Sequence, residues 1–236
     1  MAFTDAALSW LNVVRLVTLL LTALLGWITY RSHLLLQEFQ PDFNLLLSLP
    51  EIFVRLLLVG FCLLLAWLSG LSPTELGLDS ATPLQMITIG LAVGLITVVV
   101  INLLTHWAIR RFGRQIYSPQ VVKNILPHRP AEWFSVALAF LPAVAMEELL
   151  FRTLWLGCFQ PIIPVWLLIL ITSVLFGLMH QPQGQLGMIL AGGINVVFAI
   201  LFVWSGQLLL PLTAHYTTNF CQLLVAHYQR DWLENY

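Results

Sequence analysis

Charged residues are scarce in this chain. Only 9% of its 236 residues are Asp, Glu, Lys or Arg, whereas a soluble domain carries roughly a quarter. The hydrophobic share is 59%, and the mean hydropathy is +0.89. Eleven acidic residues nearly balance ten basic ones, so the net charge of −1 points away from a nucleic-acid partner. This composition excludes an ordinary soluble domain and predicts a polytopic membrane protein.

Cysteine is also rare, and the polar tracts are short. The three cysteines, Cys62, Cys158 and Cys221, lie in or beside apolar runs, and no CxxC pattern joins them. A structural disulfide or a thiolate zinc site is therefore not expected. No internal repeat or low-complexity tract is present, and the longest polar connections, about 31–51 and 108–132, are too short for a soluble domain. The first apolar run has no clear cleavage site after it, so we interpret it as a retained helix.

Long apolar runs make up most of the remaining sequence. About 20 apolar residues suffice to cross a bilayer as a helix, and seven runs approach or exceed that length. The predicted fold is therefore an all-α bundle of about seven transmembrane spans. The expected spans are Leu11–Tyr30, Ile52–Leu71, Leu84–Trp107, Trp133–Phe159, Pro164–His180, Leu186–Trp204 and Leu208–His227.

Loop charge predicts the orientation of these spans, because positively charged loops tend to stay in the cytoplasm. The connection 72–83 holds Glu75 and Asp79 but no Lys or Arg. We therefore expect an external N-terminus and a cytoplasmic C-terminus, with Arg15 as the one charge against this. The connection after the third span is either a solvated loop or an amphipathic segment on the cytoplasmic surface. Its basic residues are Arg110, Arg111, Arg114, Lys123 and Arg129.

Three charged residues interrupt the fourth span: Glu147, Glu148 and Arg152. A charge at the centre of a membrane helix costs about 2.5–3.5 kcal/mol on insertion scales, so each needs a reason. Glu148 and Arg152 are four residues apart and share a helix face, where they can pair. Glu147 lies about 100° round the helix, which leaves its carboxylate available as a general base or acid. The alternative is a purely structural polar knot between helices.

Two further polar pairs follow on later spans. The fifth span contains Phe176 and His180, and the seventh contains His215 and Asn219, each pair four residues apart on one helix face. Buried polar groups need partners, and these groups satisfy one another only where spans four, five and seven meet. Such a cluster can activate a water molecule and stabilise an oxyanion, which is the equipment for amide hydrolysis.

Taken in order, these motifs resemble those of the CPBP family of intramembrane proteases: Glu147-Glu148-xxx-Arg152, Phe176-xxx-His180 and His215-xxx-Asn219. This family, also called Abi, includes CAAX prenyl endopeptidases and bacteriocin-processing enzymes. A Gly206-Gln-Leu lead-in before the third motif fits as well. The resemblance covers roughly Trp133–Tyr228. It implies a protease core in residues 133–236, formed by the last four spans, while residues 1–132 supply N-terminal helices and the basic loop.

The resemblance also implies a role for each matched residue. The implied roles are Glu147 as the base that activates water, His180 as its assistant, His215 and Asn219 at the oxyanion, and Glu148 and Arg152 as supports. A metal-dependent mechanism is also open, in which Glu147, His180 and His215 bind zinc with a water in the open position. No HExxH motif is present to favour zinc, so a cofactor is not required by the sequence.

The implied function is an intramembrane endopeptidase whose partners are the lipid bilayer and a membrane-associated protein or peptide. A prenylated CAAX-type peptide, a bacteriocin precursor and a membrane-bound regulator are all open as substrates. The compact chain and short loops favour a bacterial inner membrane. One rival is a non-catalytic scaffold or partner-binding protein that keeps the polar cluster. Another is a proton- or ion-coupled transporter, which the absence of repeated halves disfavours.

Two expectations concern the depth of the site. We expect water to attack the peptide bond near the cytoplasmic half of the membrane. The predicted spans separate His180 from His215 by about 10 Å or more along the bundle, at 1.5 Å rise per residue. Tilted helices, a re-entrant turn near Pro182, or a different helix boundary at Pro211 would each close this gap.

Asn195 is a further polar residue, within the sixth span. Gly192 and Gly193 precede it, and small residues allow helices to approach closely. We interpret Asn195 as an interhelical hydrogen-bonding residue and Gly192 and Gly193 as its packing surface.

Overall fold

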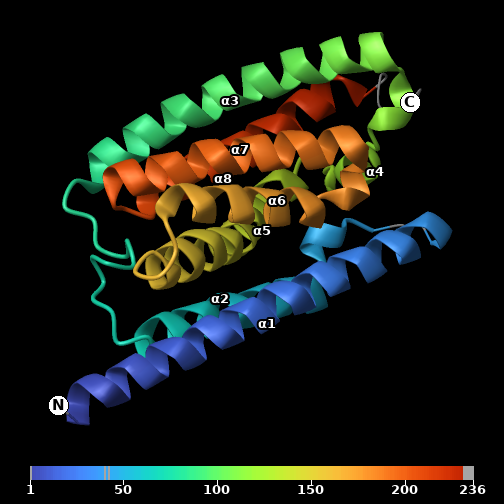
Figure 1. Ribbon diagram of the computed structural model, residues 1–236. Helices are drawn as coiled ribbons and strands as arrows, with labels where there is room; N and C mark the ends of the chain where they lie inside the picture. The colour runs from blue at the N-terminus through green and yellow to red at the C-terminus, as the bar shows by residue number, and fades with distance from the viewer. Residues whose placement is uncertain (1, 40, 42, 231–236) are drawn as a thin grey trace.

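The structure is a computed structural model that describes residues 2–39, 41 and 43–230. Every regular element in these residues is helical, and the long helices lie side by side as a bundle (Figure 1). The predicted all-α class is confirmed. In chain order the elements are α1 (Ala2–Glu38), η1 (Leu45–Leu47), α2 (Leu49–Leu68), α3 (Pro83–Phe112), η2 (Arg114–Ile116), α4 (Gln120–Ile125), α5 (Glu132–Glu148), η3 (Leu149–Gly157), α6 (Val165–Met179), η4 (Gln181–Gln183), α7 (Gly184–Ser205) and α8 (Leu209–Tyr228).

A long helix occupies each of the seven predicted spans, with α5 and η3 sharing the fourth. α6 is apolar but has only 15 residues, and α8 is interrupted by polar residues such as His215 and Asn219. With several spanning helices, the chain is an integral, multi-pass membrane protein. The described helices that are long and apolar enough to cross a membrane are Trp10–Glu38, Leu49–Leu68, Pro83–Phe112, Glu132–Gly157 and Gln181–Ser205.

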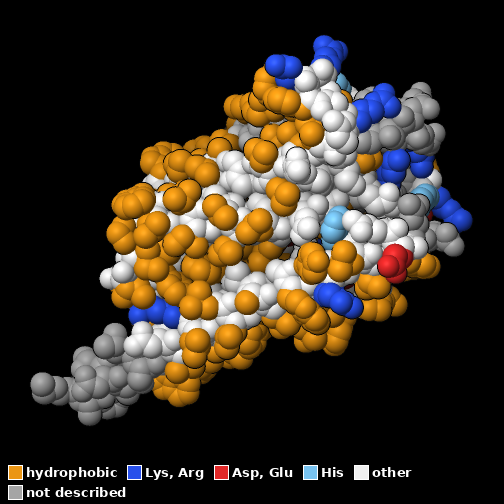
Figure 2. Space-filling model, turned by 45° about the vertical axis from the view of Figure 1, so that its right-hand side comes forward, with side chains coloured by type: hydrophobic (Ala, Val, Ile, Leu, Met, Phe, Trp, Pro, Cys, Tyr) orange, Lys and Arg blue, Asp and Glu red, His pale blue; other side chains and the backbone are white. Residues whose placement is uncertain are grey.

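One end of the bundle carries most of the positive charge, and we call it the basic end. Arg110 and Arg111 close α3 there, and Arg114, Lys123 and Arg129 follow before α5 begins. Figure 2 shows Lys and Arg side chains gathered at this end, while hydrophobic side chains cover the flank of the bundle. α8 also ends here, close to α4 (Figure 1). The connections α2–α3 and α7–α8 lie at the opposite end.

Arg15 is buried within the bundle. Its Nε donates a hydrogen bond of 2.8 Å to the carbonyl oxygen of Cys158, and its Nη1 donates one of 2.8 Å to Asn12 Oδ1. Cys158 directly follows η3, and the last carbonyls of a helix lack partners within it. Arg15 therefore joins α1 to the end of η3, and its charge carries no weight against the predicted orientation.

α3 packs very closely against α8. A Cβ atom added to Gly94 would lie 2.6 Å from Thr217 Cβ, so only glycine permits this approach. Thr218 Oγ1 also donates a hydrogen bond of 3.4 Å to the Gly94 carbonyl. The contact fixes the rotation of α8 and therefore the direction in which His215 and Asn219 point.

A valine in place of Gly94 is expected to destabilise the protein by about 1–3 kcal/mol, because overpacking forces the two helices apart. Thermal unfolding in detergent measures this as a lower midpoint. Gly60→Val on α2 is the matched control, since a Cβ there meets nothing within 4 Å. Equal midpoints for the two variants would contradict the close α3–α8 contact.

α6 and α7 also pack through glycines. A Cβ on Gly177 would lie 2.7 Å from the Met188 carbonyl oxygen, and one on Gly192 would lie 3.0 Å from the Ser173 carbonyl oxygen. The predicted packing role of Gly192 is confirmed. Gly193 has nothing within 4 Å of an added Cβ, so the same prediction for Gly193 is wrong.

The basic connection between α3 and α5 packs onto the bundle. Leu126 is 5% exposed and contacts the buried cluster that includes Leu223 of α8, with Val122 packed against the same cluster. The Ser118 N–H donates a hydrogen bond of 2.9 Å to the Gln183 carbonyl in η4. These apolar side chains therefore face the protein interior.

Candidate active site

The charged stretch lies where an α-helix changes into a π-helix. α5 ends at Glu148, and η3 continues without a break as a π-helix over Leu149–Gly157, whose nine residues are all buried. π-Helical segments are rare in proteins, and those that occur are often found at functional sites. The sequence predicted one continuous span here, which is present, but its apolar pattern did not indicate the change of helix type.

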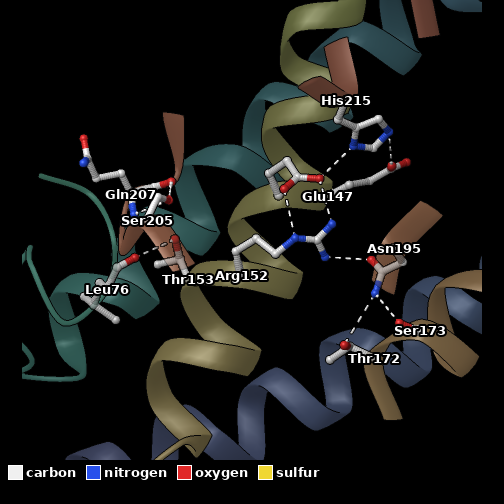
Figure 3. A network of polar contacts seen from close by, with 11 residues as sticks. Leu76, Glu147, Arg152, Thr153, Thr172, Ser173, Asn195, Ser205, Gln207 and His215 are labelled. Atoms are coloured by element: carbon white, nitrogen blue, oxygen red, sulfur yellow. Dashed lines mark hydrogen bonds and ion pairs between the residues drawn. The ribbon is translucent and has the colours of Figure 1, made fainter. Parts of the chain in front are cut away.

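Glu148, Arg152 and His215 form a buried ion-pair network (Figure 3). Arg152 Nη2 donates to Glu148 Oε1 at 3.1 Å, and Arg152 Nε lies 3.0 Å from Oε2, outside hydrogen-bonding alignment. His215 Nδ1 donates to Glu148 Oε1 at 2.7 Å. The predicted pairing of Glu148 with Arg152 is confirmed, and His215 extends it to α8.

Asn195 connects this network to two further helices. Its Oδ1 accepts a hydrogen bond of 2.7 Å from Arg152 Nη1, and its Nδ2 donates one of 3.0 Å to Ser173 Oγ (Figure 3). Thr172 Oγ1 lies 3.5 Å from the same Nδ2. Asn195 is fully buried in α7, while Thr172 and Ser173 lie on α6. The predicted interhelical role of Asn195 is confirmed, and it ties α6 and α7 to the charged stretch.

The two adjacent glutamates have different surroundings. The Glu148 side chain is fully buried, whereas 30% of the Glu147 side chain is exposed. Glu147 Oε2 lies 3.6 Å from His215 Nε2, on the side of the imidazole opposite Glu148. Glu148 is therefore held by two cationic or hydrogen-bonding partners. Glu147 keeps a carboxylate that is free to meet water.

His180 reaches the cluster by turning back along α6. Its Nδ1 lies 2.7 Å from the Phe176 carbonyl oxygen, and its ring centroid is 4.5 Å from that of Phe176. A carbonyl only accepts hydrogen bonds, so Nδ1 carries the proton and Nε2 remains an acceptor. The Phe176 ring centroid in turn lies 5.9 Å from that of His215. Phe176 thus connects the two histidines that the predicted spans had separated.

The positions of Pro182 and Pro211 show why His180 and His215 lie closer together than the predicted spans suggested. Helical side chains lean toward the N-terminus of their helix, so the His180 ring lies nearer to Phe176 than its own Cα suggests. Pro182 lies in the 3-10 turn η4, which ends α6 after about 22 Å of helix, short of a bilayer core. α8 begins at Leu209, so the suggested boundary error at Pro211 is wrong.

The four predicted catalytic residues, Glu147, His180, His215 and Asn219, line one cavity of about 320 Å³. This volume is at the lower end for small-ligand sites. Among the described residues, none makes a hydrogen bond with the Asn219 side-chain amide, which lies in an apolar span and faces the cavity. Such an amide needs a partner, and the cavity is the place from which water or substrate supplies it.

The cavity is deep when measured from the basic end. Glu147 lies about 22 Å along α5 from Glu132, and His215 lies about 21 Å along α8 from Gln229, at 1.5 Å per residue. The cavity lining continues along α8 as far as Gln229. Two separate helices therefore place the cluster beyond the middle of the bundle.

The described residues contain no group of three His, Cys, Asp or Glu side chains placed to hold a metal ion. Glu147 and His215 approach each other, but the Nδ1 of His180 is engaged by the Phe176 carbonyl, and its ring lies against that of Phe176 at an angle of 32°. The alternative zinc set of Glu147, His180 and His215 is not assembled in this arrangement. The residues as placed do not fit a zinc site.

Sequence reasoning missed some members of the site. Ser173 and Thr172 support Asn195, yet Ser and Thr in an apolar helix often bond only to their own backbone. Phe198 packs against His215 with ring centroids 5.2 Å apart, and nothing distinguishes it from other apolar residues of α7. One sequence signal was available for Ser173: it lies about one helical turn before Phe176, on the helix face that carries the Phe176-xxx-His180 motif.

The part of the chain that carries this cluster is similar to known proteins. Residues 129–221 match the family model described as Rce1-like, type II CAAX prenyl endopeptidase. The uncharacterized protein YpbD of Bacillus subtilis (strain 168) is 29% identical over 124 residues, which are 50% of this chain and 56% of YpbD. The chain thus aligns with little more than half of that relative's length. No solved structure matches the chain. The matched segment carries all three motifs, so over these residues the chain is similar to the type II CAAX prenyl endopeptidase family described as Rce1-like.

Proposed function

We propose that this protein is an intramembrane endopeptidase that hydrolyses a peptide bond of a membrane-associated protein or peptide. The observation that carries the proposal is the placement of Glu147. Its carboxylate lines a cavity within a membrane bundle, contacts His215, and lies beside a second glutamate that is already fully engaged. Prenylated CAAX-type substrates are within this class, because the matched family is described by that activity.

The proposed reaction begins with a water molecule held between Glu147 and His180 Nε2. Glu147 accepts a proton from this water as the oxygen attacks the scissile carbonyl, and it returns the proton to the leaving amine. The resulting oxyanion accepts hydrogen bonds from the Asn219 amide and from His215 Nε2 when that nitrogen is protonated. Glu148, held by Arg152, fixes the orientation of His215 through Nδ1.

The site is proposed to open toward the cytoplasm. The cavity lining runs toward the basic end, where Arg55 of α2 also lines it. Positively charged connections tend to remain cytoplasmic, which supports a cytoplasmic C-terminus. A bacterial inner membrane is the proposed location, supported by the Bacillus subtilis relative.

The proposal is tested by cleavage of a quenched fluorescent prenylated CAAX peptide by the purified protein in detergent. Parallel reactions with and without a strong zinc chelator separate a metal-free from a metal-dependent reaction. We expect cleavage that withstands the chelator. Loss of cleavage with chelator and its return with added zinc would contradict the metal-free mechanism. Absence of cleavage of this and of unprenylated membrane peptides would favour the non-catalytic scaffold.

Asn219→Ala is expected to lower kcat by about 10²–10³-fold with little change in KM, because an oxyanion donor acts mainly in the transition state. Steady-state kinetics on any cleaved peptide measures the two parameters separately. Cys221→Ala, two residues along α8 and half-buried, is the control and is expected to retain parental kcat. A rise in KM alone for Asn219→Ala would instead assign this amide to substrate binding.

A further inference from the structure

A stripe of polar side chains runs along α8 from the reactive cluster toward the basic end. His215, Asn219, Gln222 and Gln229 follow one another at spacings of four, three and seven residues, which keep them on one helix face. All four line the same cavity. Only the first two are explained by the proposed chemistry, which leaves two glutamines on this face without a role.

A second row of polar residues faces this stripe from α3. Asn102, Thr105 and His106 line the same cavity. Asn102 Nδ2 lies 3.4 Å from Gln222 Oε1, and Gln222 Nε2 lies 3.4 Å from the Val98 carbonyl oxygen. Asn102 Nδ2 also donates a hydrogen bond of 2.8 Å to the Val98 carbonyl oxygen, whereas both bonds of Gln222 are long, so Gln222 is the weakly engaged amide. Amides inside a membrane bundle are costly unless something uses them.

Another part of the cavity lining is apolar. Val122 and Ile125 of the basic connection, Phe140 of α5 and Leu223 of α8 belong to this apolar part. A ligand in this space therefore meets both hydrogen-bonding amides and hydrocarbon. A peptide backbone with apolar side chains matches both parts, because each residue carries one donor and one acceptor.

The dimensions of the cavity select an extended chain. From His215 to Gln229 the stripe is about 21 Å long, which equals about six residues of extended peptide. The cavity volume of about 320 Å³ is small for that length, so the space is narrow. A narrow channel lined by amides accepts a single extended strand and excludes a folded or helical segment, whose diameter is about 10 Å.

We propose that Gln222, Asn102 and Gln229 form a backbone-binding subsite that holds about six extended substrate residues on one side of the scissile bond. This inference rests on the proposed function and deepens it. The substrate is then a chain long enough to reach from the basic end to Glu147. The subsite selects weakly for the amino-acid sequence of the substrate, since amide side chains bond to any peptide backbone. It selects strongly for the length and the extended conformation of the substrate.

Binding to the Glu147→Gln protein tests the subsite without cleavage. The probe is a library of fluorescently labelled apolar peptides, and fluorescence polarisation measures their Kd in detergent. The best binder is then shortened one residue at a time and rebuilt with single backbone amides replaced by esters. We expect affinity to stay constant until about six residues remain on the labelled side, and to fall with each residue removed after that. One ester is expected to weaken binding about fivefold, the size of one lost hydrogen bond.

Gln222→Met, introduced into the same protein, is expected to remove the effect of that ester while keeping the side-chain volume. Gln85→Met, exposed at the far end of α3, is the matched control and should leave the ester effect unchanged. Ester effects that are identical in the two variants would overturn the subsite, as would equal affinity for a three-residue peptide or no binding of any peptide. Peptide binding that depends on Gln222, with no cleavage by the parent protein, would overturn the proposed function alone.

Discussion

Glu147→Gln is expected to reduce peptide cleavage by at least about 100-fold while leaving the protein folded. A general base contributes about 10²–10⁴-fold to a rate, and the amide cannot accept the proton of the attacking water. The substitution keeps the size of the side chain, 30% of which is exposed. Initial rates on a cleaved peptide and a thermal unfolding curve in detergent measure the two effects separately.

The neighbouring residue supplies the sharpest comparison. Glu148→Gln removes a charge that is fully buried and bonded to both Arg152 and His215, so it is expected to lower the unfolding midpoint as well as the rate. Asp79→Asn, exposed in the α2–α3 connection, should change neither. A Glu147→Gln protein that cleaves at the parental rate, beside a folded and inactive Glu148→Gln protein, would reverse the roles assigned to the two glutamates.

Arg152→Met is expected to destabilise the protein by about 3–5 kcal/mol, because it leaves the Glu148 carboxylate buried without its counter-charge. It also removes the donor to Asn195 and so disconnects α6 and α7 from the site. Chemical or thermal unfolding in detergent gives the loss. The matched control is Arg55→Met, which breaks another pair at the same four-residue spacing with Glu51. That pair is partly exposed, and its loss is expected to cost about 0–1 kcal/mol.

A double variant distinguishes lost charge pairing from lost packing. Arg152→Met combined with Glu148→Gln removes both charges, so it is expected to recover much of the stability that the single variant loses. Equal stability of the parent and the single Arg152→Met variant would contradict the buried ion pair. A double variant less stable than either single variant would show that the charges were not the main contribution.

Much of the fold was predictable because the bilayer imposes simple rules. Each span needs about 20 apolar residues, and five of the seven runs found on this basis coincide with described helices that are long and apolar enough to cross a membrane. The pairing of Glu148 with Arg152 followed from helix spacing alone. The meeting of α5, α6 and α8 followed from a need for partners, since isolated polar groups in these spans are costly.

What the sequence could not predict depends on neighbours rather than on local pattern. The π-helix that begins at Leu149 has no local sequence signal, because the same run of apolar residues is compatible with an α-helix and with a π-helix. The sequence gives no reason to distinguish Gly192 from Gly193, yet only Gly192 faces α6. Arg15 resembled a topogenic charge and instead bonds to the Cys158 carbonyl. The depth of His180 depended on where α6 ends, which the turn at Pro182 determines.

The central claim is that Glu147 activates water for peptide hydrolysis inside the membrane, and one measurement tests it for any substrate that the cell contains. Membranes from matched cells that produce the parent protein or the Glu147→Gln variant are compared by mass spectrometry of protein termini. We expect a set of new termini in membrane-associated proteins that appears only with the parent protein. Identical termini in the two samples, at equal levels of folded protein, would contradict it.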